Sequence, residues 1–122
     1  MKIVYSACYG GYGLSEAAVL RYAELAGIQL YPEKESFYTD YYLTPPTGDK
    51  QVDDRRDTFE TDSIERHDAL LVRVVEELGE KANSRFSKLT IYETDSRMYR
   101  IDEYDGYETV KTGYSDDSWV IV

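Results

Sequence analysis

The sequence predicts a single small domain of the α+β class, with a mixed or antiparallel sheet and two helices. The length of 122 residues lies within the usual range of one domain. Only two segments show the apolar spacing of a helix, whereas strand-like segments follow one another in groups. Because helices and strands do not alternate strictly, a doubly wound parallel sheet is disfavoured. The predicted order is β-α-β-β-loop-α-β-β-β, in one domain over residues 1–122.

A first strand and a first helix are joined by a glycine-rich break. Lys2 to Ala7 contains consecutive β-forming residues and stops before the glycines, which predicts a buried strand. Ser15 is a typical N-cap residue, and Glu16 to Ala26 carries an apolar stripe at helical spacing. Gly27 is well suited to end that helix, because helices often stop at a glycine.

The middle of the chain predicts two short strands and a long connection. Ile28 to Tyr31 is the first strand, ended by Pro32, and Ser36 to Leu43 is the second, rich in tyrosine and threonine. Residues 44–62 begin with a turn-rich Thr-Pro-Pro-Thr-Gly run and contain few apolar side chains. We therefore expect a long, partly mobile loop over residues 44–62.

A second helix is the clearest amphipathic segment of the chain. Its apolar side chains fall on one helical face from Ala69 to Leu78 or Lys81, and Asp68 is the expected N-cap. Strand-like runs then follow to the end of the sequence. These runs are Lys88 to Thr94, Met98 to Tyr104, Tyr107 to Lys111 and Trp119 to Val122.

Two turns between these C-terminal runs predict hairpins. The first is the segment Thr94-Asp95-Ser96, which combines residues common in turns. The second is Asp105-Gly106, a strong signal for a two-residue hairpin.

Composition limits the classes of function. There are 14 basic and 24 acidic side chains, and the resulting charge of −10 disfavours direct binding to nucleic acid or to an anionic membrane. Cys8 is the single cysteine, so neither an intrachain disulfide nor a four-cysteine zinc site is expected. No apolar run reaches the length of a membrane span, and the first residues do not resemble a signal peptide. We expect a soluble, cytoplasmic protein.

The glycine-rich segment after the first strand is the first candidate site. Amides of Gly10, Gly11 and Gly13 at the start of a helix favour phosphate or carboxylate, and Ser15 lies beside them. Tyr9 and Tyr12 are placed to stack on a base. No Gly-Lys-Ser/Thr follows, so this is not a P-loop, and a third glycine is missing for a dinucleotide fingerprint. The alternative is a tight turn in which the glycines serve backbone geometry alone.

Two further polar segments are candidates for the same site. Arg66-His67-Asp68 stands at the start of the second helix, and Asn83 and Arg85 stand after its end. These side chains can hydrogen-bond a nucleotide or supply a counter-charge. The alternative is structural: Arg66 to Asp68 would only begin the second helix, with Asp68 as its cap, and Asn83 and Arg85 would only belong to the end of that helix and the connector after it.

The sequence supports a catalytic site less well than a binding site. Cys8 with His67 would make a thiol nucleophile and its base, but one residue of each kind often occurs by chance. Ser15 with His67 lacks the Gly-x-Ser-x-Gly elbow of a serine hydrolase. The carboxylates of Glu103, Asp105 and Glu108 surround a hairpin turn and would suit a divalent metal, although acidic hairpins are usually just solvated.

Five segments carry a resemblance to a known family. They are Cys8 to Ser15, Arg66 to Asp68, Leu71 to Asn83, Lys88 to Ile91 and Glu103 to Gly106. In this order they resemble motifs of a widespread group of small bacteriophage proteins, whose first motif reads CYGGFGLS. Tyr12 replaces a usual phenylalanine, and Ala69 stands where proline often opens the second helix. Members of this group are mostly of unknown function.

The resemblance implies a function in phage counter-defence. Small acidic phage proteins often oppose host immunity, and one class sequesters nucleotide signals such as cyclic dinucleotides or cyclic ADP-ribose derivatives. The implied protein is non-catalytic, needs no cofactor, forms a homo-oligomer and acts in the host cytoplasm. Its 13 tyrosines suit half-buried interfaces. The alternative is an acidic interaction protein or nucleic-acid mimic that inhibits a host protein. A metal-dependent nuclease or phosphodiesterase that uses Glu103 and Asp105 is the least favoured hypothesis.

Overall fold

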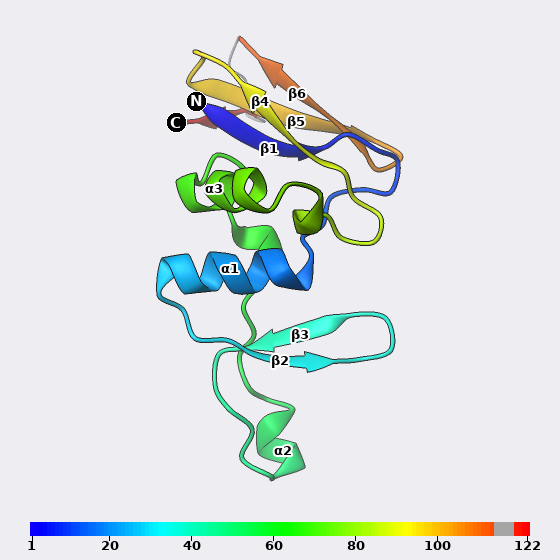
Figure 1. Cartoon of the computed structure of the whole chain (residues 1–122), viewed down its shortest axis with the longest axis vertical. Helices are drawn as coiled ribbons and strands as arrows, with labels where there is room; N and C mark the ends of the chain where they lie inside the picture. The colour runs from blue at the N-terminus through cyan, green and yellow to red at the C-terminus, as the bar shows by residue number, and fades with distance from the viewer. Residues whose placement is uncertain (114–118) are drawn as a thin grey trace.

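The computed structural model describes residues 1–113 and 119–122. It confirms the α+β class, with helices and antiparallel sheets in one elongated molecule. Figure 1 shows strands gathered at one end, helices α3 and α1 across the middle, and the β2–β3 hairpin with α2 at the other end. No helix in the described part of the chain is long and apolar enough to cross a membrane.

Two antiparallel sheets form the first end of the molecule. β1 (Lys2–Ser6) pairs with β4 (Leu89–Glu93). β5 (Met98–Tyr104) lies between β6 (Tyr107–Thr112) and β7 (Val120–Ile121). Buried side chains from both sheets pack into one cluster, which includes Ile3, Tyr99 and Val110. The apolar alternation of the strands therefore joins the two sheets around a shared core.

The helices form a layer between these sheets and the β2–β3 hairpin (Figure 1). α1 (Glu16–Ala26) and α3 (Ala69–Leu78) pack on one another, and a 3₁₀ turn η2 (Gly79–Ala82) extends α3. The core between them contains Val4, Ala18, Tyr22, Leu71 and Val74. Both predicted helices are confirmed, as is the expectation that the second ends at Leu78 or Lys81.

The predicted caps are confirmed as well. The Ser15 hydroxyl accepts the Ala18 amide, and the Asp68 carboxylate accepts the amides of Leu70 and Leu71. Gly27 ends α1 with φ of 73°, the left-handed conformation that glycine adopts at little cost.

The first strand predicted in the middle of the chain is misplaced. β2 is Tyr31–Lys34, so it begins where the predicted strand over residues 28–31 ends and it contains Pro32. Ile28 and Leu30 instead pack against α1 beside Val19, which takes them out of the hairpin. β2 is paired on one side only, and proline is tolerated on such an edge strand because no ladder amide is needed there. Its partner β3 (Thr39–Tyr42) falls inside the predicted strand.

Residues 44–62 are more structured than the predicted loop. They contain α2 (Lys50–Asp53) and the start of a 3₁₀ turn η1 (Thr61–Ser63). The Arg56 guanidinium lies 3.8 Å from the centre of the Tyr42 ring and donates to the Thr44 carbonyl and the Glu33 carboxylate. An arginine side chain only 6% exposed thus organises a segment with few apolar residues.

One of the two predicted hairpin turns is confirmed. Asp105 and Gly106 have positive φ values of 51° and 90°. These two residues join β5 to β6 through a tight turn of the type that Asp-Gly pairs favour. The segment over residues 94–96 is not a hairpin turn, because β4 pairs with β1 and β5 pairs with β6 and β7. A turn signal does not specify whether the strands on its two sides pair with each other.

Candidate ligand-binding site

The glycine-rich segment is packed against two other parts of the chain. A Cβ atom added at Gly10 would overlap the backbone carbonyl of Phe86, and one added at Gly106 would overlap the carbonyl of Tyr9. The segment therefore passes between the connector after η2 and the β5–β6 turn at distances that only glycine permits. This supports the geometric alternative for Gly10.

Serine and cysteine side chains hold the segment in place. The Ser6 hydroxyl donates to the Gly11 carbonyl at 2.8 Å, and the Ser87 hydroxyl donates to the Gly13 carbonyl at 2.7 Å. The Cys8 thiol donates to the Phe86 carbonyl at 2.9 Å. These bonds satisfy carbonyl groups of the segment and of the connector, and the Gly11 amide donates to the Cys8 carbonyl at 3.4 Å. The path of the segment is therefore fixed by bonds within the fold.

Tyr12 and Arg66 meet in the space beside β1. The Arg66 guanidinium lies 3.4 Å from the centre of the Tyr12 ring and forms a two-pronged ion pair with Glu108, at 2.8 and 2.9 Å. Glu108 also accepts the Ser6 amide at 2.8 Å and is 6% exposed. Both charges are thus neutralised within the fold. Burial raises the pKa of Tyr12 to about 12, and its hydroxyl has no hydrogen-bond partner in the described part of the chain.

His67 and Asp68 have structural partners too. Nδ1 of His67 lies 2.7 Å from the hydroxyl of Tyr99, a residue 2% exposed. Asp68 caps α3 and accepts the Tyr22 hydroxyl at 2.9 Å. Burial, followed by this contact with Asp68, raises the pKa of Tyr22 to about 12. The Arg66-His67-Asp68 triplet therefore ties β5, β6, α1 and α3 together.

Two arrangements that the sequence disfavours also lack the contacts that their chemistry would need. Cys8 and His67 hydrogen-bond to different partners, Phe86 and Tyr99. Among the residues that the structure describes, no group of three or more histidine, cysteine, aspartate or glutamate side chains is placed to hold a metal ion. Glu108 differs from the solvated acid expected at the hairpin, because Arg66 and Ser6 bind it in the interior.

Four of the ten predicted site residues line one cavity. This cavity has a volume of about 510 Å³ and lies between the start of α1, the β2–β3 hairpin and the connector after η2. Gly13 and Ser15 lie on its α1 side, and Asn83 and Arg85 lie on the connector. Its size is within the range of roughly 300–1,000 Å³ typical of small-molecule sites.

Aromatic side chains of the hairpin form another wall of this cavity. Phe37, Tyr38 and Tyr41 all line it, with Phe37 98% exposed and Tyr38 61% exposed. Burial raises the pKa of Tyr41, and the nearby Glu16 carboxylate raises it further. Exposed rings beside a cavity offer flat surfaces on which a base can stack.

Polar groups of the cavity are only partly used by the fold. The Oδ1 atom of Asn83 accepts the Leu89 amide at 2.8 Å, which leaves its side-chain NH₂ group as the donor. The Arg85 guanidinium lies 5.4 Å from the Phe86 ring and forms no ion pair within the described residues. Glu16 pairs with Lys34 of β2 at 3.3 Å.

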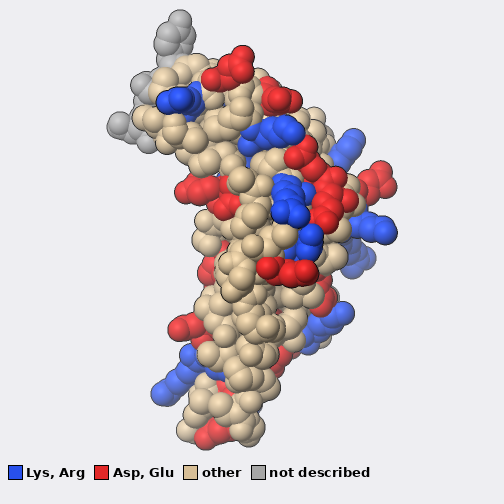
Figure 2. Space-filling model, turned by 60° about the vertical axis from the view of Figure 1, so that its left-hand side comes forward, with Lys and Arg blue, Asp and Glu red and all other residues tan. Residues whose placement is uncertain are grey.

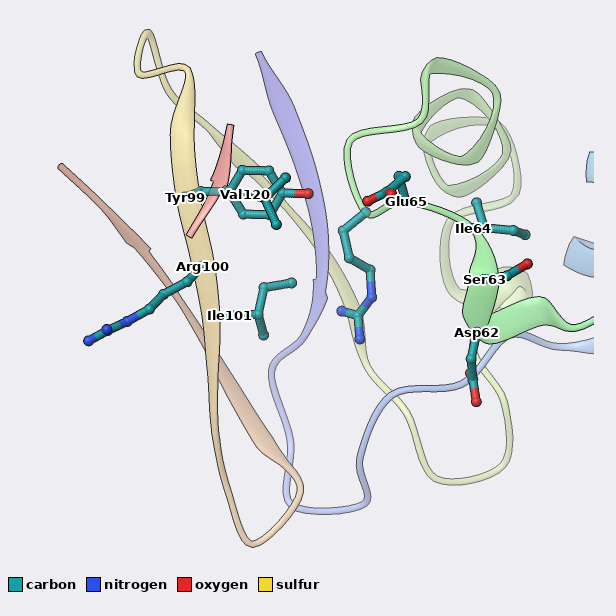
Figure 3. Close-up of a pocket in the computed structure, with 9 residues that line it drawn as sticks. Asp62, Ser63, Ile64, Glu65, Tyr99, Arg100, Ile101 and Val120 are labelled. Carbon is teal, nitrogen blue, oxygen red and sulfur yellow. The ribbon is translucent and has the colours of Figure 1, made fainter. Parts of the chain in front are cut away.

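A second cavity, of about 370 Å³, lies between η1 and β5 (Figure 3). Figure 3 shows Tyr99 and Ile101 pointing from β5 towards β1, whereas Arg100 points to the opposite side of the strand. Arg66 is the predicted site residue that lines this cavity, and its guanidinium is already bound by Glu108.

The remaining predicted residues lie outside both cavities. Gly10, Gly11 and Tyr12 are packed within the glycine-rich segment. Tyr9 is 67% exposed, and its ring centre lies 5.2 Å from that of Tyr107. Sequence reasoning missed Phe37, Tyr38, Tyr41 and Glu16, because the tyrosine-rich run was interpreted only as a strand and Glu16 only as a helix residue.

Comparisons of the chain with protein-family models, with curated proteins and with solved structures find no match in any of the three.

Proposed function

We propose that this protein binds a small nucleotide in the cavity between α1 and the β2–β3 hairpin. The observation that carries the proposal is the meeting of Arg85 and Asn83 with the exposed rings of Phe37 and Tyr38 around one opening. An arginine supplies a counter-charge for phosphate, and an aromatic ring supplies a stacking surface for a base. Phosphate and base are the two parts of a nucleotide that a small site must recognise.

The proposal extends to a non-catalytic role. The protein would hold a nucleotide immune signal of the cyclic dinucleotide or cyclic ADP-ribose type and so oppose host antiviral defence, as the resemblance to phage proteins implies. Such a sequestering protein would assemble into a homo-oligomer and act in the host cytoplasm. If the bound nucleotide is recovered unchanged after the protein is denatured, the role is sequestration; hydrolysis of the nucleotide would refute it.

Binding is tested by calorimetry and thermal shift with cyclic dinucleotides and cyclic ADP-ribose. We expect Arg85→Ala to weaken binding at least tenfold, because the cavity then loses the cation that faces it. Arg97→Ala is the matched control, since Arg97 is an exposed arginine that does not line the cavity. Equal affinities of the two variants, or no binding by the unaltered protein, would contradict the proposal.

The formal charge of −10 supports one alternative, an acidic protein that mimics nucleic acid. A mimic needs its acidic groups on one face. The face in Figure 2 carries blue Lys and Arg side chains among the red Asp and Glu side chains, so it is mixed in sign. Pull-downs from host extract distinguish the two proposals, because a mimic should recover a DNA-binding protein and a nucleotide-binding protein should not.

A further inference from the structure

Among the residues that the structure describes, the charged side chains that line the cavity between α1 and the β2–β3 hairpin are one cation and one anion. Arg85 lies on the connector after η2, and Glu16 lies in the first turn of α1. Lys34 pairs with Glu16 at 3.3 Å, but it is 73% exposed. Counted together, Arg85, Glu16 and Lys34 give this region a single net positive charge.

We propose that this cavity selects phosphate groups that carry one negative charge each, and that Glu16 is the residue that sets this selectivity. Such groups are phosphodiester linkages and the internal pyrophosphates of cyclic nucleotides. Terminal phosphates would be disfavoured. This inference rests on the proposed function, since it names the class of nucleotide that the same site accepts.

The argument follows from the charges of the two kinds of phosphate. A terminal phosphate loses its second proton near pH 6 and carries roughly −2 at neutral pH, whereas a diester phosphate carries one charge. One arginine neutralises one charge. The second charge of a terminal phosphate would face the Glu16 carboxylate, and like charges at short range repel.

Glu16 lines the cavity from the first turn of α1. Its backbone follows Ser15, whose hydroxyl caps α1 and donates to the Lys81 carbonyl at 2.6 Å. Its side chain is 35% exposed and directed to Lys34 on the facing hairpin. Lys34 partly screens this carboxylate, but it is 73% exposed and does not line the cavity, whereas Glu16 does.

Glu16 also has a role that involves no ligand. An acidic side chain in the first turn of a helix stabilises that helix through its dipole. A test must therefore separate selectivity from stability. Affinity for two ligands that differ by one charge does so, because a change in helix stability affects both ligands alike.

The experiment uses adenosine 5′-monophosphate and its methyl ester, which share base and sugar and differ by one phosphate charge. The guanosine pair is measured in parallel. We expect the unaltered protein to prefer the methyl ester. We expect Glu16→Gln to tighten binding of the monophosphate by roughly threefold to tenfold, with a smaller change for the ester. Glu24→Gln is the control, because it removes one charge from the last turn of the same helix, away from the cavity.

The outcomes separate this inference from the proposal on which it rests. If neither member of either pair binds at millimolar concentration, and cyclic dinucleotides and cyclic ADP-ribose do not bind either, the nucleotide site itself is wrong; if the cyclic nucleotides bind and the methyl esters do not, the preference for singly charged phosphates is overturned. If both members bind and Glu16→Gln leaves their affinity ratio unchanged, or if Glu24→Gln changes the ratio as much, the site stands and the role of Glu16 is overturned.

Discussion

Replacement of Arg66 by methionine tests whether the Arg66-His67-Asp68 triplet is structural. Methionine keeps a long apolar side chain over the Tyr12 ring but removes the guanidinium that lies 3.4 Å from the ring centre. Glu108, which is 6% exposed, then loses both bonds from Arg66 and keeps the Ser6 amide at 2.8 Å. A buried carboxylate without its counter-charge is the main cost of the change.

The size of the effect follows from the burial of the pair. Removing one member of a buried ion pair costs about 3–5 kcal/mol. The Arg66 side chain is 23% exposed, so water reaches part of the pair and the lower end of about 3 kcal/mol applies. A domain of this length has a free energy of unfolding of roughly 6–18 kcal/mol. We therefore expect Tm to fall by roughly 10 °C while the protein still folds.

Urea unfolding followed by circular dichroism measures the change. Arg97→Met is the control, since Arg97 is exposed, and it should alter stability by less than about 0.5 kcal/mol. The double variant Arg66→Met with Glu108→Met removes the stranded carboxylate as well. It should be more stable than the sum of the two single changes predicts. A loss below about 1 kcal/mol for Arg66→Met, or strict additivity in the double variant, would refute the structural role.

Three further predictions concern Tyr12, Tyr22 and Gly10. Tyr12→Phe should leave stability unchanged or raise it by up to about 1 kcal/mol, because it removes a buried hydroxyl without a partner; a clear loss in urea unfolding would show that the hydroxyl is bound. The pKa values of Tyr12 and Tyr22 are raised to about 12, mainly by burial, so the free energy of unfolding does not respond to their ionisation below about pH 10 and falls as the pH rises towards 12, because these hydroxyls ionise first in the unfolded chain. Unfolding midpoints between pH 8 and 11.5 should fall less in the Tyr12→Phe/Tyr22→Phe variant, and an equal fall would contradict this assignment. Gly10→Ala should cost at least about 2 kcal/mol, because the new methyl group overlaps the Phe86 carbonyl; a change within about 0.5 kcal/mol, measured by thermal unfolding, would show that the segment can move aside.

The parts of the fold predicted correctly depend on local signals. Ser15, Asp68 and Gly27 act through backbone groups within a few residues, so their roles as helix boundaries can be recognised without the rest of the chain. The Asp105-Gly106 turn is similar, since its positive φ values depend on those two residues. The misplaced strand before Pro32 shows the limit, because Leu30 became part of the α1 core instead.

The candidate site was predicted only in part. Gly13, Ser15, Asn83 and Arg85 line one cavity, but the predicted Arg66 is bound to Glu108, 42 residues further along the chain. A motif of polar residues looks the same in a sequence whether its charges face a ligand or a buried partner. The aromatic wall was missed because no local pattern indicates that the β2–β3 hairpin faces the start of α1.

The α+β class, the two main helices with their caps, and the tight turn between β5 and β6 can be predicted from the amino-acid sequence alone. These features follow from periodicity and from interactions between residues close in the chain. Contacts between distant parts of the chain establish that β4 pairs with β1, that Arg56 organises the segment after β3, and that Arg66 neutralises Glu108. They also decide which polar groups remain at the cavity, because burial and long-range partners determine whether a charge is consumed by the fold or left to meet a ligand.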